Sequence, residues 1–164
     1  MSETIVSRPA RAARPWVRGD FATKVLSYHM MIDDPIVLAI RRRAGLASLM
    51  EAEKALGATL ETLLERLPLS LREQLLFALP PTVAERFSLP QVESNQPFSF
   101  DEFCQRLADR EGTDVPVAVF HARCVLHVLS ESLATADVLE RVATHLTNDF
   151  APLFWQATGT ASAA

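Results

Sequence analysis

The chain has 164 residues, of which 49% are hydrophobic and 22% are charged, and its formal net charge is -4. This composition excludes a disordered chain and predicts one soluble globular domain or two small fused units. No apolar run is long enough to cross a bilayer, because the richest one, Val115 to Leu129, is interrupted by His121, Arg123 and His127.

The cysteine pattern and the first residues predict where the protein is found. The chain has two cysteines without the spacing of a disulfide framework. Its first residues lack the charged and then apolar pattern of a signal peptide. Both observations indicate a reducing compartment, so we expect a cytoplasmic protein.

Residues 1–19 are predicted to form a disordered basic arm, because they contain too little apolar surface to offset the entropy of ordering them. The candidate interaction residues of the arm are Arg8, Arg11, Arg14, Trp16 and Arg18. Such an arm binds an acidic scaffold, nucleic acid or an anionic membrane through its charge, or it serves as a solubilising tail. The sequence leaves these interpretations open.

The net charge is unevenly distributed along the chain, and its first part is basic. Residues 1–32 carry five basic and two acidic side chains, so the remaining residues must carry a net charge of -7. An acidic body argues against non-specific nucleic-acid binding by the folded part of the protein.

Residues 20–32 are predicted to form a docking helix that follows the arm. Asp20 is typical of a helix cap, and Phe21, Val25 and Tyr28 recur at helical spacing on one face. We expect this apolar face to pack against the rest of the protein.

The next helix is predicted to begin at Asp34, which precedes a proline, and to end before Gly45. Its last turn carries Arg41, Arg42 and Arg43. The helix dipole favours cations at this end, so a solvated, dipole-matched helix end explains the arginines. The alternative is a site for phosphate or for an acidic partner.

A long amphipathic helix is predicted after Ser48, which forms a capping box with Glu51. Its apolar stripe consists of Leu49, Ala52, Leu56, Leu60, Leu63 and Leu67. A stripe of this kind must be buried against another element.

A shorter helix is predicted to follow, with Ser70 and Glu73 as a second capping box and a Pro-Pro pair as its stop signal. A short turn from Thr82 to Phe87 would then complete a first helical unit, residues 33–87. Residues 88–98 contain two prolines and no sustained period, so they are predicted to be a linker.

A second helical unit is predicted at residues 99–155, opened by a capping box of Ser99 with Glu102. Residues 156–164 are rich in Ala, Ser and Thr and are predicted to be a disordered tail.

The second unit is a degenerate copy of the first. An offset of 67 pairs Arg43 with Arg110 and Gly45 with Gly112, and an offset of 66 pairs Leu60 with Leu126 and Leu63 with Leu129. The offset then returns to 67 and pairs Leu75 with Val142 and Phe87 with Phe154. This pattern predicts an all-α, compact helical bundle made of two pseudo-repeated multi-helix units packed together.

The phrases LETLLERLPLSLREQLLFALPPTVAERF, SFDEFCQRLADREG and VLHVLSESLATADVLERVATHLTNDFAPLFW resemble the bacterial family known as domain of unknown function 2267. The resemblance covers about Asp34 to Trp155 and implies a tandem helical repeat. It implies no active-site residues, because the shared pattern consists of apolar positions. The chain departs from the family pattern in its arm, in the helix at residues 20–32, and at His145-Leu146-Thr147, where Leu-Pro is commoner.

One group of side chains is a weak candidate for a metal site. His121, Cys124 and His127 lie at i, i+3 and i+6, and Cys104 comes from the preceding predicted helix. The first unit has Ala55, Ala58 and Glu61 at the matching positions. The helical unit that was duplicated therefore does not need metal ligands at these positions. We therefore favour a buried thiol beside the core, and we expect neither a metal nor a cofactor.

No nucleophilic serine elbow and no phosphate-binding glycine loop is found in the sequence. The favoured hypothesis is a non-enzymatic interaction, adaptor or structural module that binds a protein partner or a second copy of itself. One alternative is a protein that binds a metal or small molecule, with or without catalysis, near His121, Cys124 and Cys104. The other is binding of an acidic scaffold or nucleic acid by the arm.

Overall fold

The computed structural model describes residues 34–87, 97–133 and 137–154, and all regular structure in these ranges is helical. The predicted all-α class is therefore confirmed. The basic arm, the predicted docking helix at residues 20–32, most of the linker and the tail lie outside the described residues.

The first described helix, α2 (Pro35–Ala44), begins and ends where the sequence predicts. Oδ1 of Asp34 accepts a hydrogen bond from the backbone N–H of Ile36 at 2.9 Å. Gly45 adopts the left-handed conformation, with a φ of 67°, which most side chains disfavour. These two caps set the length of α2.

The long helix α3 (Leu49–Arg66) has a capping box at its start and an arginine at its end. Ser48 accepts a hydrogen bond from the backbone N–H of Glu51, whose carboxylate accepts one from the backbone N–H of Ser48. At the other end, the buried Arg72 donates from Nε to the backbone oxygen of Leu67 at 2.6 Å. The guanidinium group thus pairs a carbonyl just past the end of α3 and places a cation where the helix dipole favours it.

Helix α4 (Leu69–Ala78) begins earlier than expected, so the predicted capping box of Ser70 with Glu73 is wrong. Pro68 is the N-cap, and no side chain caps this helix. Since Ser70 lies inside the first turn rather than in front of it, its hydroxyl is not placed to accept from the free N–H groups of that turn. The short helix α5 (Pro81–Ala84) follows.

The second half presents a similar order of helices. Helix α6 (Phe100–Glu111) is capped by Ser99, which accepts a hydrogen bond from the backbone N–H of Glu102 at 3.2 Å. The Glu102 carboxylate pairs with Arg106 instead of with the backbone of Ser99, so only half of the predicted capping box forms. The helix ends at Gly112 with a φ of 70°. The remaining elements are α7 (Val115–Ser132), α8 (Asp137–His145), the 3-10 turn η1 (Asn148–Phe150) and α9 (Ala151–Phe154).

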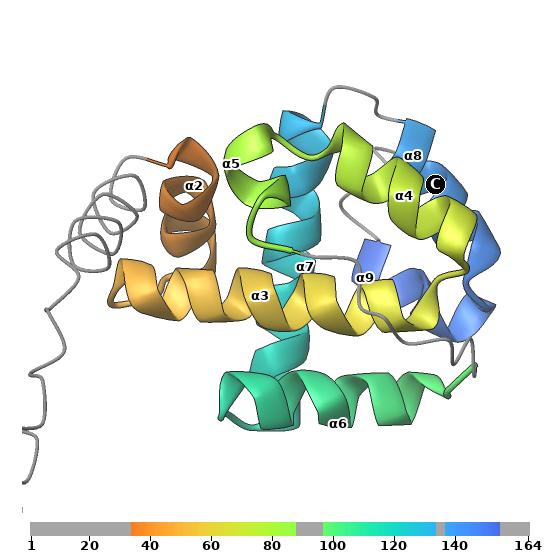
Figure 1. Cartoon of the computed structure of the whole chain (residues 1–164). Coiled ribbons are helices and arrows are strands. Elements are labelled where there is room, and N and C mark those ends of the chain that lie inside the picture. Colours follow the sequence, from red (N-terminus) through yellow and green to blue (C-terminus); the bar gives the residue numbers. More distant parts are fainter. Residues whose placement is uncertain (1–33, 88–96, 134–136, 155–164) are drawn as a thin grey trace, which may run out of the picture.

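The two long helices cross at the centre of the protein, and the others pack around them. Figure 1 shows α7 running across α3, with α6 alongside α3. Helix α2 packs against both long helices, and so does α6. Helices α4 and α8 pack against each other at the end of α3 that is farther from α2.

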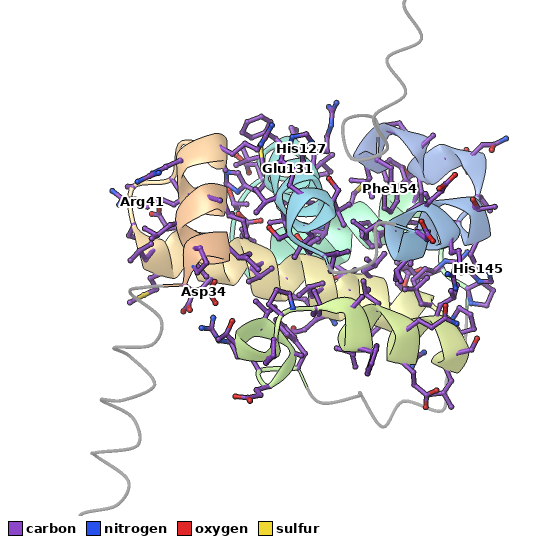
Figure 2. All side chains as sticks on the ribbon, turned by 90° about the horizontal axis from the view of Figure 1, so that it is seen from above. Asp34, Arg41, His127, Glu131, His145 and Phe154 are labelled. Carbon is purple, nitrogen blue, oxygen red and sulfur yellow. The ribbon has the colours of Figure 1, made fainter. Side chains whose placement is uncertain are left out.

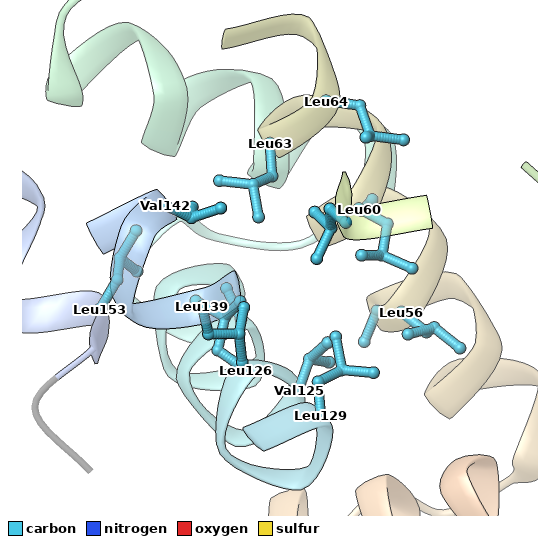
Figure 3. Close-up of a cluster of buried hydrophobic side chains, with 14 of the residues drawn as sticks. Leu56, Leu60, Leu63, Leu64, Val125, Leu126, Leu129, Leu139, Val142 and Leu153 are labelled. Carbon is cyan, nitrogen blue, oxygen red and sulfur yellow. The ribbon is translucent and has the colours of Figure 1, made fainter. Parts of the chain in front are cut away.

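The core forms where the leucine faces of α3 and α7 meet. Leu60 and Leu63 of α3 point toward Leu126 and Leu129 of α7, and all four side chains are fully buried (Figure 3). Most of the predicted stripe residues are buried with them. The aromatic residues Phe150 and Phe154 are also buried, Phe87 packs against the core in part, and Trp155 lies outside the described residues.

The helix order matches the offsets found in the sequence. Helices α3 and α7 each have 18 residues and are related by the offset of 66. An ion pair joins Arg43 of α2 to Glu131 of α7 at 3.4 Å, and another joins Arg110 of α6 to Glu65 of α3. Both ion pairs connect equivalent positions, although the duplication itself stays a prediction.

The packing predicts that Leu63→Ala is strongly destabilising. Leu63 is completely buried, so its truncation loses transfer free energy and leaves a cavity, at a cost of about 2–5 kcal/mol. Urea denaturation followed by circular dichroism measures the free energy of unfolding. Leu69→Ala is the control, because Leu69 is 59% exposed and its truncation should change stability by less than about 0.5 kcal/mol. Equal losses in the two variants would contradict the packing described above.

Candidate interaction surface

The three consecutive arginines at the end of α2 have different surroundings. Arg41 donates from Nε to the backbone oxygen of Leu46 at 3.4 Å, which ties it to its own helix end. Arg43 reaches across to Glu131 of α7. Arg42 makes no hydrogen bond or ion pair with any residue that the structure describes. Of the three arginines, only Arg41 therefore donates a hydrogen bond to a backbone oxygen just past the end of α2.

The solvent-facing side of α7 lies beside these arginines. Val117, Phe120, Arg123, His127 and Glu131 recur at spacings of three and four, so they share one face of the helix. Val117 is 41% exposed and Phe120 is 49% exposed. Nε2 of His127 lies 3.3 Å from the Glu131 carboxylate, and Figure 2 shows these two side chains together on α7.

The charges of one arginine from each helix act on the buried thiol of Cys124 on α7. Burial raises its pKa, and the positive charges of Arg43 and Arg123 offset part of that rise. Both guanidinium groups are therefore close to the same point where α2 packs on α7. We define the α2–α7 surface as Arg42, Arg43, Val117, Phe120, Arg123 and His127.

The equivalent face of α3 has a different character. At the offset of 66, the residues that correspond to the α7 face are Glu51, Lys54, Gly57, Glu61 and Glu65. This face is polar, and its arginines are paired: Arg110 of α6 contacts Glu61 and Glu65, and Arg106 contacts Glu65 and Glu102. One scaffold thus carries a balanced polar face on α3 and a cationic, partly apolar face on α7.

His121, a predicted candidate, is paired with a carboxylate from the preceding helix. Its Nδ1 contacts the Glu111 carboxylate, and both side chains are largely buried. The corresponding positions in the first half are Ala44 and Ala55. The fold therefore accommodates apolar residues at this contact, and the pair is a polar substitute that joins α6 to α7.

The structure does not assemble the predicted metal-site candidates into a cluster. Among the described residues, no three His, Cys, Asp or Glu side chains come together in a way that could hold a metal ion. Cys104 is buried on α6, where burial and the charge of Asp101 raise the pKa of its thiol. Both cysteines are free thiols.

A shallow, open depression lies where α4 packs against α8, with a volume of about 570 Å³. Its lining residues are Leu71, Asp137, Glu140, Arg141, Thr144 and His145. Arg141 donates to Gln74 at 2.7 Å. The lining mixes both charges without a buried functional group, so the depression is a weaker candidate than the α2–α7 surface.

The most exposed large apolar side chain among the described residues is Phe77 on α4, with 94% of its surface accessible. The equivalent position on α8 is Thr144. The next exposed apolar side chain of α4, Leu69, lies two turns away. Phe77 shares its face of α4 with the exposed Glu73 and Leu69, and the arginine of this helix, Arg72, is buried, so the face lacks the cationic residues of the α2–α7 surface.

An acidic cluster lies at the start of α2. Arg86 donates to Glu53 at 2.8 Å and lies 3.6 Å from Oδ2 of Asp34, which is too long for a hydrogen bond. Oδ2 of the buried Asp34 thus receives charge compensation without a hydrogen bond. Burial raises the pKa of the Glu53 carboxyl group, and the Arg86 charge opposes the rise. The cluster joins α2, α3 and the segment after α5, which indicates a structural role.

The remaining candidate interaction residues belong to the arm and fall outside the described residues: Arg8, Arg11, Arg14, Trp16 and Arg18. Within the described ranges, no helix combines the length and the apolar character needed to cross a membrane.

Sequence reasoning named Arg42, Arg43 and His127 but missed three residues that the structure shows to be exposed or paired beside the named candidates. Phe120 was not singled out, because its exposure depends on how α7 packs. Glu111 and Glu131 were missed because their partners, His121 and Arg43, lie on other helices. Two signals for Glu131 were available in the sequence: its spacing of four from His127 on the same helix, and the offset, which pairs Glu131 with Glu65.

The raised pKa of Glu53 predicts a pH effect in Glu53→Gln. A carboxyl group whose folded-state pKa is raised stabilises the fold fully below its unfolded pKa, and this contribution is lost as the pH rises through the folded-state pKa. Wild type should therefore lose stability relative to Glu53→Gln as the pH rises above the ordinary glutamate value of about 4.5. Urea denaturation at several pH values measures the difference. If wild type instead gained stability relative to Glu53→Gln as the pH rose, the ion pair with Arg86 would outweigh the desolvation of the carboxyl group.

The buried pair predicts strong coupling between Glu111 and His121. Glu111→Ala should cost about 1–3 kcal/mol, because it leaves a buried ring nitrogen without its partner. The double variant Glu111→Ala, His121→Ala has alanines at both positions, as the first half has at Ala44 and Ala55. Its loss of unfolding free energy should therefore be smaller than the sum of the losses in the two single variants. A double-mutant cycle of unfolding free energies gives the coupling. Additive losses would mean that the contact contributes nothing.

Comparison with known proteins identifies a family to which most of the chain is similar. The family model described as "Uncharacterized conserved protein (DUF2267)" matches residues 33–153, which include nearly all of the described helices. No curated protein matches the sequence.

Proposed function

Because the chain belongs to the DUF2267 family, whose description states no activity, we propose a function from the surface of the protein itself. The protein is a non-enzymatic interaction module, and it binds a protein partner through the α2–α7 surface. The partner is either another protein or a second copy of this chain. This is the hypothesis that the sequence favoured, now assigned to particular residues.

One observation carries the proposal: the contrast between the equivalent faces of α7 and α3. Where α3 has Lys54 and Gly57, α7 has Phe120 and Arg123. The α3 face supports a long helix of the same length with four charged residues and a glycine. The fold therefore does not require an exposed aromatic and an uncompensated arginine on α7.

The residue types on this surface are those that contribute most to protein interfaces. Aromatic residues and arginine are enriched among the side chains that dominate binding energy. Half of Phe120 faces solvent, and burying it against a partner is favourable by roughly 25 cal/mol per Å² of apolar area. Arg123 beside it makes no ion pair with a described residue. The surface combines an apolar contact with charges that can select a partner.

The two alternatives from the sequence gain no comparable support. In the described ranges, the histidines and cysteines named for a metal site do not gather into a set of ligands. The arm lies outside the described residues, so binding by the arm stays a separate hypothesis. Two free, buried thiols support a reducing compartment, and we place the module in the cytoplasm.

A pull-down with surface variants tests the proposed function. The purified full-length protein, Phe120→Ser and Phe77→Ser serve as baits in lysate of the native cell, and captured proteins are quantified by mass spectrometry. Phe77→Ser is the matched control, because it removes a more exposed phenylalanine from a different helix. We expect at least one protein, or the chain itself, to be retained by wild type and Phe77→Ser and lost with Phe120→Ser.

Three outcomes would overturn the proposal. One is equal capture by all three baits, and another is loss only with Phe77→Ser, which would move the interface to α4. The third is the absence of any specific partner, together with a monomeric wild-type protein. Thermal unfolding of each bait shows that a loss of binding is not a loss of fold, since both substitutions are on exposed side chains.

A further inference from the structure

The α2–α7 surface carries more positive charge than its place in the fold requires. Helix α6 ends at the same kind of left-handed glycine as α2, but its last turn holds a single arginine, Arg110. The three arginines of α2 therefore exceed what the helix dipole and termination need. Arg42 and, on α7, Arg123 have no acidic partner among the described residues.

Glu131, the one acidic residue on this face of α7, shows that the basic side chains here pair with a carboxylate. The Glu131 carboxylate lies 3.4 Å from Arg43 and 3.3 Å from His127, so it bridges the two helices. Its side chain is 60% exposed, and an exposed ion pair of this kind is weak. A carboxylate from another molecule can therefore compete for the same guanidinium group.

An apolar contact lies at a fixed distance from these charges. Along the axis of α7, Arg123 lies about 5 Å from Phe120, and Glu131, the partner of Arg43, lies about 16 Å from it, so the middle of the charged part is about 10 Å from Phe120. Three residues of extended peptide span about the same distance. A ligand that uses both parts needs an apolar side chain and carboxylates separated by this length.

We infer that the α2–α7 surface binds an acidic peptide segment of a partner protein, one that carries an apolar residue about 10 Å from two or more carboxylates. The apolar residue packs on Phe120, and the carboxylates pair with Arg42, Arg43 and Arg123. This inference rests on the proposed function and specifies the chemistry of the partner. Nucleic acid is the less suitable polyanion, because a long strand extends beyond this surface over a chain whose net charge is -4, whereas a short acidic segment stays on the cationic surface.

Fluorescence anisotropy with defined probes tests the inference. The main probe is a labelled 14-residue peptide with one Leu followed, three residues later, by three consecutive Glu. A peptide with Gln in place of Glu, a peptide with Ser in place of Leu, and a 15-nucleotide uridine RNA complete the set. We expect binding of the main probe that weakens with added salt, and affinities at least about tenfold lower for the two altered peptides.

Protein variants assign the binding to the surface. Arg42→Glu combined with Arg123→Glu should lower the affinity about tenfold or more, by reversing two charges that make no ion pair in the described fold. Arg141→Glu is the control, since this arginine lies on α8, and it should leave the affinity unchanged. Glu131→Gln should raise the affinity about threefold, because it removes the carboxylate that competes for Arg43. A gain of this kind cannot result from unfolding.

The outcomes separate this inference from the proposed function. Equal binding of the Gln peptide, tighter binding of RNA, or unchanged affinity in the double charge variant would overturn the acidic peptide. If these results came with a protein partner lost in Phe120→Ser, the interaction module would stand and the partner chemistry would be wrong. If the peptide bound as expected and no native partner depended on Phe120, the proposed function would be wrong.

Discussion

The crossing of α3 over α7 is the contact on which the other helices depend. Leu60, Leu63, Leu126 and Leu129 are buried there, and neither long helix can hide its leucine face by itself. Helices α2 and α6 then pack on both long helices and close the two sides of the crossing. The hydrophobic effect thus organises the fold through one central contact rather than through separate cores.

This arrangement gives the protein two equivalent faces with different surfaces. The contact of Arg110 with Glu65 and the contact of Arg43 with Glu131 occupy corresponding positions. Around the first, neighbouring charges are balanced by further ion pairs. Around the second, arginines and Phe120 are left to solvent. The interior constrains both faces alike, whereas solvent-facing positions are free to differ, which is why we assign the function to the α2–α7 surface.

Local signals in the sequence predicted much of the fold. Asp34, Ser48 and Ser99 cap helices as expected, because a cap depends on residues that are three or fewer positions away. The Ser70 prediction was wrong because Pro68 starts α4 two residues earlier and Arg72 turns back to the end of α3. The sequence pattern could not anticipate that contact between helices.

The candidate surface was predictable only in part, for the same reason. Consecutive arginines are visible in a sequence, and Arg42 and Arg43 were named from their place at a helix end. The pairing of Arg43 with Glu131 depends on how α2 packs against α7, and so does the exposure of Phe120. Helical spacing gives the residues that share a face, but it does not tell which face another helix covers.

The contact between α2 and α7 also bears on how the protein is made. Arg43 and Glu131 are separated by 88 positions, so α2, the first described helix, meets α7 only after most of the chain has been synthesised. Until α7 leaves the ribosome, the apolar sides of α2 and α3 that pack on α7 have no surface to cover them. The nascent first half must therefore wait in an incompletely folded form, in which exposed leucines invite chaperones or aggregation.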